Sequence, residues 1–139
     1  MGEVISVISG KGGTGKTTVC AAVASCLAAE GSRVLCIDAD IGLRNLDIAL
    51  GMAELPVLAF TEVLEGNFTL MDATAHPELD KLFLLTAPSR AGDRSVSPAA
   101  FAMLLRDARE QHPVFTPQRE IVPDAREESV HAADHLVGA

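Results

Sequence analysis

The sequence lacks tryptophan, tyrosine and any long hydrophobic run. A membrane-spanning helix needs about 18 or more consecutive apolar residues, so we expect no membrane helix in this chain. The first residues, Met1–Ile5, contain neither a basic stretch nor a cleavage site, and we therefore expect no signal peptide. Together these absences predict a soluble, cytoplasmic protein.

Basic residues are scarce and scattered along the chain. The 139 residues include 11 Lys and Arg against 19 Asp and Glu, which gives a formal net charge of −8. A nucleic-acid-binding surface needs clustered Lys and Arg to neutralise phosphates. No such cluster is present in the sequence, so we expect no nucleic-acid partner.

The chain has three cysteines, Cys20, Cys26 and Cys36, and no Cys-x-x-Cys spacing. The alternatives are metal or iron–sulfur ligands and buried structural thiols. Because each cysteine stands among apolar or small neighbours, the sequence favours buried free thiols in a reducing compartment.

A strand–helix–strand unit is predicted at the start of the chain. The apolar, β-branched run over 4–9 is typical of a strand buried in a parallel sheet. Small residues over 16–30 predict a helix that ends at Gly31, and the apolar run over 33–38 predicts a second strand. Such a unit indicates an α/β fold with parallel strands.

Further elements are expected after a polar loop over 39–47. The pattern predicts a short helix over 56–65, a strand over 81–86 and a helix that opens at Ser97. The apolar face of this last helix is formed by Phe101, Leu104, Leu105 and Ala108.

The sequence changes character after Gln111. Residues 112–120 contain two prolines and show no convincing strand, although 114–116 could form a short one. A final helix is expected over 127–137, where His131 and His135 are interpreted as part of a solvated face rather than a metal pair.

The turn between the first strand and the first helix contains the pattern G-x-x-x-x-G-K-[ST]. Its residues are Gly10, Lys11, Gly12, Gly13, Thr14, Gly15, Lys16 and Thr17, followed by Thr18. Glycines let backbone N–H groups surround a phosphate, and the following helix start adds partial positive charge. The alternative is a glycine-rich turn that binds nothing, but the strand-to-helix context favours a P-loop. The dinucleotide pattern G-x-G-x-x-G is absent from this turn.

Two carboxylates follow the second predicted strand. Asp38 ends the strand and Asp40 comes two residues later. Ligands of doubly wound α/β folds bind at the carboxyl ends of the strands, so both side chains are expected beside the P-loop. Asp47, later in the same loop, is interpreted as a solvated carboxylate.

These motifs resemble those of the MinD/ParA/nitrogenase-iron-protein superfamily. Residues 9–18 are similar to its deviant P-loop, whose mark is the extra lysine, here Lys11. Residues 38–47 resemble the MinD branch in particular, the septum-site-determining ATPases. The resemblance covers about 1–110, which suggests a nucleotide-binding domain over 1–111 and a divergent tail over 112–139.

The resemblance implies a P-loop NTPase fold, a parallel sheet with helices on both faces, and an ATP-dependent homodimer. It implies that Lys16 and Thr17 hold phosphate and Mg²⁺, and that Asp38 lies near the metal. By the same resemblance Lys11 reaches the partner's nucleotide and Asp40 helps to position the attacking water. The catalytic set would then be Lys11, Lys16 and Asp40. Family members attach peripherally to the inner face of the membrane, through a helix that is not found in this chain.

The resemblance also exposes a departure from the family. Family members continue after the helix that ends near Glu110 with an apolar strand closing in Asp, the Walker B strand, and 112–117 do not match it. Residues 121–125 and 129–137 instead resemble the following strand and helix. The sequence therefore predicts an incomplete ATPase domain with little or no hydrolysis alone, whose first strand has lost a neighbour. The alternatives are a nucleotide-dependent interaction module, a non-functional fragment and a ParA-type DNA partition ATPase.

Overall fold

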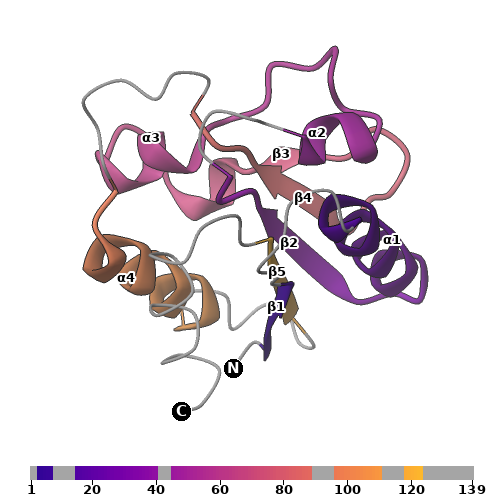
Figure 1. The fold of residues 1–139 in the computed structure, drawn as a ribbon, viewed down its shortest axis with the longest axis horizontal. Coiled ribbons are helices and arrows are strands. Elements are labelled where there is room, and N and C mark those ends of the chain that lie inside the picture. Colours follow the sequence, from indigo (N-terminus) through magenta and orange to yellow (C-terminus); the bar gives the residue numbers. More distant parts are fainter. Residues whose placement is uncertain (1–2, 8–14, 41–44, 89–95, 111–117, 124–139) are drawn as a thin grey trace.

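The computed structural model describes residues 3–7, 15–40, 45–88, 96–110 and 118–123. Within them a central sheet has helices on both sides (Figure 1). The elements are β1 Glu3–Val7, α1 Lys16–Ala29, β2 Arg33–Ile37, α2 Leu46–Ala49, α3 Phe60–Leu64, the 3₁₀ turn η1 Leu70–Asp72, β3 Thr74–Ala75, β4 Leu82–Leu85, α4 Pro98–Glu110 and β5 Gln118–Pro123. None of the helices in this described part is long and apolar enough to cross a bilayer.

The five strands lie in the order β1-β5-β2-β4-β3. All neighbours are parallel except β3 and β4, which pair antiparallel. As expected, the sheet is parallel across β1, β5, β2 and β4, and the short strand β3 makes it a mixed sheet. The reason is the short connection between β3 and β4, since a parallel neighbour requires a crossover of a dozen or more residues.

The strand β5 lies between β1 and β2. Ile121 faces Ile5 of β1 on one side and Cys36 of β2 on the other. Two sequence predictions are therefore wrong: β1 has a parallel neighbour, and Gln118–Glu120 belong to a strand. Ladder hydrogen bonds come from the backbone, so a segment of mixed polar and apolar residues can join two parallel strands. The predicted stub at 114–116 and the helix at 127–137 lie outside the described residues.

Successive side chains of β2 belong alternately to two hydrophobic clusters, one on each face of the sheet. Val34 and Cys36 pack with α1, whereas Leu35 and Ile37 pack with the buried side of α4. This alternation follows from the two-residue period of a strand. The prediction of helices on both faces is confirmed.

Helix α4 was expected to bury one apolar face, and it does. Phe101, Leu104, Leu105 and Ala108 are all buried. The Phe101 ring meets that of Phe60 edge-on, at 5.6 Å between centroids. At the start of the helix the Ala100 N–H donates to the Ser97 hydroxyl at 3.1 Å, so Ser97 caps the helix as predicted.

The helix predicted over 56–65 is shorter, because residues before α3 bond to strands instead. The Leu58 N–H donates to the Thr74 hydroxyl at 2.9 Å, and the Thr86 N–H donates to the Leu58 carbonyl at 2.9 Å. Ala59 forms a parallel bridge with Thr86. These tertiary hydrogen bonds hold the backbone extended up to Phe60, where the helix begins.

Two of the three cysteines are buried as predicted. Cys20 and Cys36 lie in the cluster between α1 and β2, but Cys26 is exposed on α1, so the prediction is wrong for that residue. A hydrogen bond with the Cys20 thiol, together with burial, raises the pKa of Cys36 well above its ordinary value. Cys36 is therefore an unreactive structural thiol.

Candidate nucleotide-binding site

The first turn of α1 is built to receive an anion. Gly15 precedes it with φ 85°, in the left-handed region that favours glycine, and its carbonyl accepts the Val19 N–H at 2.9 Å. The N–H groups before Val19 therefore have no acceptor within the helix. The first turn contains no acidic residue, and Lys16 and Thr17 in it are only half-buried. N–H groups that lack a partner within the helix, the helix dipole and the Lys16 ammonium all favour a bound phosphate.

The remaining P-loop residues lie outside the described part of the chain. They are Gly10, Lys11, Gly12, Gly13 and Thr14. Their phosphate-binding roles, and the role of Lys11 in a partner's site, stay predictions. So do the roles of Gly15, Lys16, Thr17 and Thr18, although the structure places these four together at the helix start.

Asp38 leaves the carboxyl end of β2 with a buried side chain, of which 2% is exposed. Its carboxylate accepts the Asp40 N–H at 3.0 Å and the Leu46 N–H at 3.2 Å. Burial raises the pKa of Asp38, the two backbone hydrogen bonds lower it, and the charges of Asp40 and Asp47 raise it, with a net upward shift. Asp38 thus joins the end of β2 to the start of α2.

The strand register places Asp38 at the same sheet edge as the P-loop. Val7, the last residue of β1, faces Pro123, and Cys36 faces Ile121. Continuing that register by two residues sets Asp38 level with Pro123 and Val7. With strands about 4.8 Å apart, the Asp38 backbone lies on the order of 10 Å from Val7, the last residue of β1. The strand β5 lies between the two, so Asp38 and the end of β1 share the carboxyl edge of the sheet without being neighbours.

Asp40 and Asp47 differ in their surroundings. Asp40 is half-buried, and its backbone N–H donates to the Asp38 carboxylate. The role of its side chain in positioning water stays a prediction. Asp47 is only 5% exposed, and its interpretation as a solvated carboxylate is wrong. Its side chain accepts the Ile48 N–H at 2.9 Å, and its carbonyl accepts the Met52 N–H at 2.7 Å. The spacing of the buried residues Leu46 and Leu50 was the sequence signal for this helical turn.

A magnesium ion would need ligands beyond the carboxylates. In the described part of the chain, no three His, Cys, Asp or Glu side chains gather in a metal-binding arrangement. Mg²⁺ commonly binds through one or two protein oxygens together with substrate phosphates and waters. The Thr17 hydroxyl and the Asp38 carboxylate are oxygen donors of the kind that Mg²⁺ takes, and the nucleotide would supply the remaining oxygens.

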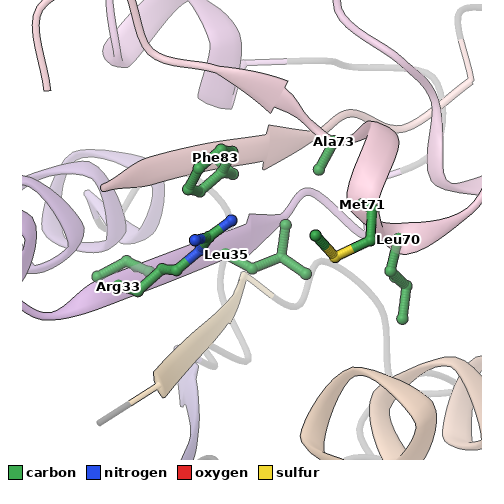
Figure 2. Close-up of a pocket in the computed structure, with 7 residues that line it drawn as sticks. Arg33, Leu35, Leu70, Met71, Ala73 and Phe83 are labelled. Carbon is green, nitrogen blue, oxygen red and sulfur yellow. The ribbon is translucent and has the colours of Figure 1, made fainter. Parts of the chain in front are cut away.

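A small cavity lies on the α4 face of the sheet, away from this edge. It measures about 20 Å³, room for roughly one water molecule. Figure 2 shows Arg33 and Phe83 at its rim, and the Arg33 guanidinium lies 4.5 Å from the Phe83 ring centroid. Arg33 begins β2 whereas Asp38 follows its end, so this cavity is separate from the P-loop edge.

The sequence profile of the CobQ/CobB/MinD/ParA nucleotide-binding domain matches residues 5–129 of the chain. The chain belongs to this family. A CobQ/CobB/MinD/ParA domain agrees with the P-loop sequence, the helices on both faces of the sheet and the carboxylates at its carboxyl edge.

Within this family, the chain is similar to septum site-determining MinD proteins. It is 42% identical to MinD of Thermotoga maritima over 108 residues, which are 77% of this chain and 40% of that protein. It is 34% identical to MinD of Bacillus subtilis over 113 residues, which are 80% of this chain and 42% of that protein. The chain therefore spans about two fifths of the length of these relatives.

Solved MinD structures share the fold. The MinC:MinD cell division protein complex of Aquifex aeolicus superposes with a TM-score of 0.76 at 32% identity, over 94% of this chain and 51% of that one. MinD of Pyrococcus horikoshii, complexed with Mg-ADP, gives a TM-score of 0.73 at 26% identity, over 96% of this chain and 54% of that one. The prediction of a MinD-like P-loop NTPase fold is confirmed.

Proposed function

We propose that this chain is a MinD-like protein of cell-division-site regulation that binds ATP with Mg²⁺. The observation that supports the proposal is the P-loop sequence, which runs into a helix start at Gly15 and Lys16 without an acidic residue in the first turn. MinD of P. horikoshii, which shares the fold, was solved with Mg-ADP. The proposed location is the cytoplasm, where family members attach peripherally to the inner face of the membrane.

In this proposal Lys16 places its ammonium against the β- and γ-phosphates, and the Thr17 hydroxyl ligates Mg²⁺. The N–H groups of the first turn of α1 surround the phosphate. Asp38 lies near the metal in this proposal, while its two oxygens also accept the N–H groups of Asp40 and Leu46. The Asp40 carboxylate, only half-buried, is the group proposed to orient the attacking water.

We further propose that this chain alone hydrolyses ATP at or near background. Phosphoryl transfer requires Mg²⁺ to be held in place while a water is aimed in line. In the family the strand beside β1 closes in an aspartate. Here that position is held by β5, whose sequence ends in Pro123. Because β1 pairs with β5, an unpaired first strand is not the reason for low hydrolysis. The proposal therefore rests on the missing acid alone.

Nucleotide binding is tested by thermal unfolding. A ligand that binds only the native state raises the melting temperature by mass action. Mg²⁺ with ATP should therefore raise the melting temperature of the full chain. Lys16→Ala should abolish this shift, because it removes the ammonium group that contacts the phosphates. Lys81→Ala is a matched control, since Lys81 donates to the Gly31 carbonyl far from the phosphate site. Equal shifts in all three proteins would contradict ATP binding at the P-loop.

Hydrolysis is tested by steady-state phosphate release, with Lys16→Ala as the blank. We expect the full chain to match that blank within error. Turnover well above it would contradict the proposal and show that another acid, Asp40 or the Asp124 that follows β5 in sequence, has taken the missing role. Asp40→Asn and Asp124→Asn variants would then separate the two.

A further inference from the structure

A groove of about 380 Å³ runs between α4 and the segment from α3 to η1. Both elements lie on the side of the sheet opposite α1 (Figure 1). One wall is formed by Val63 and Leu64 of α3 together with Phe68 and Leu70. None of the residues that line the groove is among the predicted nucleotide-site residues.

The other wall is a stripe along α4. Ala100, Met103, Leu104 and Asp107 follow the spacing i, i+3, i+4, i+7, which puts them on one side of the helix. Leu104 is 3% exposed and forms the floor, while Met103 is 54% exposed and forms the lip. A groove between two helical walls with apolar residues at this spacing suits a third helix.

Exposed apolar side chains gather around this groove. Five large hydrophobic residues are exposed in the described part of the chain. Of these, Phe68 at 46% and Met103 at 54% line the groove, and Met71 at 59% is adjacent to Leu70. Clustered exposed apolar side chains mark interaction surfaces, whereas isolated ones need no explanation. Methionine in particular adapts its shape to a bound helix.

The rim of the groove is acidic. Residues 62–72, which run from α3 to η1, contain three Asp and Glu and no Lys or Arg. Glu62 and Glu65 both accept the Asn67 side-chain amide, at 2.9 and 3.4 Å, next to Phe68. Asp107 adds a carboxylate on the α4 wall. An apolar floor with a negative rim is complementary to a helix that carries Lys or Arg beside its apolar stripe.

We propose that this groove binds a basic amphipathic helix of a partner protein. Its apolar anchors, spaced i, i+3, i+4 and i+7, lie between Met103 and Phe68. Its Lys or Arg side chains lie over Asp107 and the pair Glu62 and Glu65. Because no residue that lines the groove is among the predicted nucleotide-site residues, this binding does not depend on the proposed nucleotide function.

The probe is a displayed library of helical peptides with a randomised face, selected against the full chain. Peptides enriched on the wild type should carry an apolar stripe flanked by Lys or Arg. Met103→Asp places a charge at the lip and should weaken them by about tenfold or more, as expected for a central anchor. Ile48→Asp is the matched control, because Ile48 is 64% exposed on α2 and lies outside the groove.

The charge of the rim is tested separately with Asp107→Lys. This variant should weaken the selected peptides several-fold at low salt, and the difference should shrink as salt screens the charges. Asp107→Lys also tests peptide binding at the groove if the Met103→Asp variant fails to fold. Enrichment of acidic or uncharged peptides, or equal binding to wild type and both groove variants, would overturn the proposal.

Other occupants are distinguished by a photo-crosslinking phenylalanine analogue at position 68 of the full chain. With the selected peptide present, we expect crosslinks to the peptide. Crosslinks that persist to residues 124–139 of the same chain would assign the groove to that segment and overturn the proposal. Crosslinks to a second copy, with self-association lost in Met103→Asp, would overturn it in favour of a dimer.

Discussion

The carboxylate of Asp38 accepts the backbone N–H of Leu46 at 3.2 Å, a contact between the end of β2 and the start of α2. Its other oxygen accepts the Asp40 N–H. One buried side chain therefore fixes both ends of the loop that follows β2, on the edge where the P-loop helix begins.

Removal of the Asp38 carboxylate should destabilise the fold. Asp38→Ala leaves the buried Leu46 N–H without its acceptor, which costs about 1–3 kcal/mol of unfolding free energy. Asp38→Asn should cost less, because its amide oxygen still accepts one N–H and no charge is buried. Chemical denaturation measures both, with Asp80→Ala, an exposed carboxylate, as the control. A loss in Asp38→Ala no larger than in the control would contradict this role.

The stability contribution of Asp38 should depend on pH. Its pKa in the folded protein is raised above the ordinary value of 3.8, first by burial. The native state therefore binds the proton more tightly than the unfolded chain. Relative to Asp38→Asn, the unfolding free energy of the wild type should rise as pH falls through the raised pKa. This gain should be complete below 3.8 and lost at neutral pH.

Denaturation of both proteins across this pH range checks the prediction. The negative charges of Asp40 and Asp47 contribute to the upward shift. Asp40→Asn keeps the backbone N–H that bonds Asp38 but removes one of these charges, so it should flatten the dependence. The prediction is contradicted if the difference in unfolding free energy between the wild type and Asp38→Asn stays constant or falls on acidification. Burial would then not control the pKa of Asp38.

His76 should stabilise the segment before β4. Its Nε2 lies 2.8 Å from the Leu50 carbonyl, and its Nδ1 lies 3.1 Å from the N–H groups of Glu78 and Leu79. In the tautomer that accepts at Nδ1, the Nε2–H donates to the Leu50 carbonyl. His76→Ala should lower the unfolding free energy by about 1–3 kcal/mol. Glu78→Ala, an exposed neighbour, should change it by less than about 0.5 kcal/mol.

Lys11 is predicted to act across an ATP-dependent dimer. If so, Lys11→Ala should weaken self-association in the presence of a non-hydrolysable ATP analogue more than it weakens nucleotide binding. Light scattering measures the association, and the thermal shift measures the binding. Lys16→Ala should lose both and serves as the comparison. A wild-type chain that stays monomeric with the analogue would count against the dimer for this chain.

The sequence by itself determined the elements whose signals are local. The P-loop pattern predicted the start of α1, and Gly31, with φ 100°, marks its end as expected. The 3.6-residue period identified all four buried residues of α4, and the apolar runs identified β2 and β4. Each of these signals depends on residues within a few positions of one another, and local backbone preferences are sufficient to read them.

Tertiary structure alone decided the features that depend on distant contacts. Gln118–Pro123 pairs with β1 and β2, although more than 80 residues separate it from either strand in the sequence. Side-chain patterns do not encode such a pairing of backbones. Asp47 is buried because Leu46 and Leu50 anchor its turn in the core, and Cys26 is exposed because α1 presents that position to solvent. The hydrogen bond between Asp38 and the Leu46 N–H also depends on a contact between residues that are not sequence neighbours. Only the folded chain brings Leu46 to the Asp38 carboxylate.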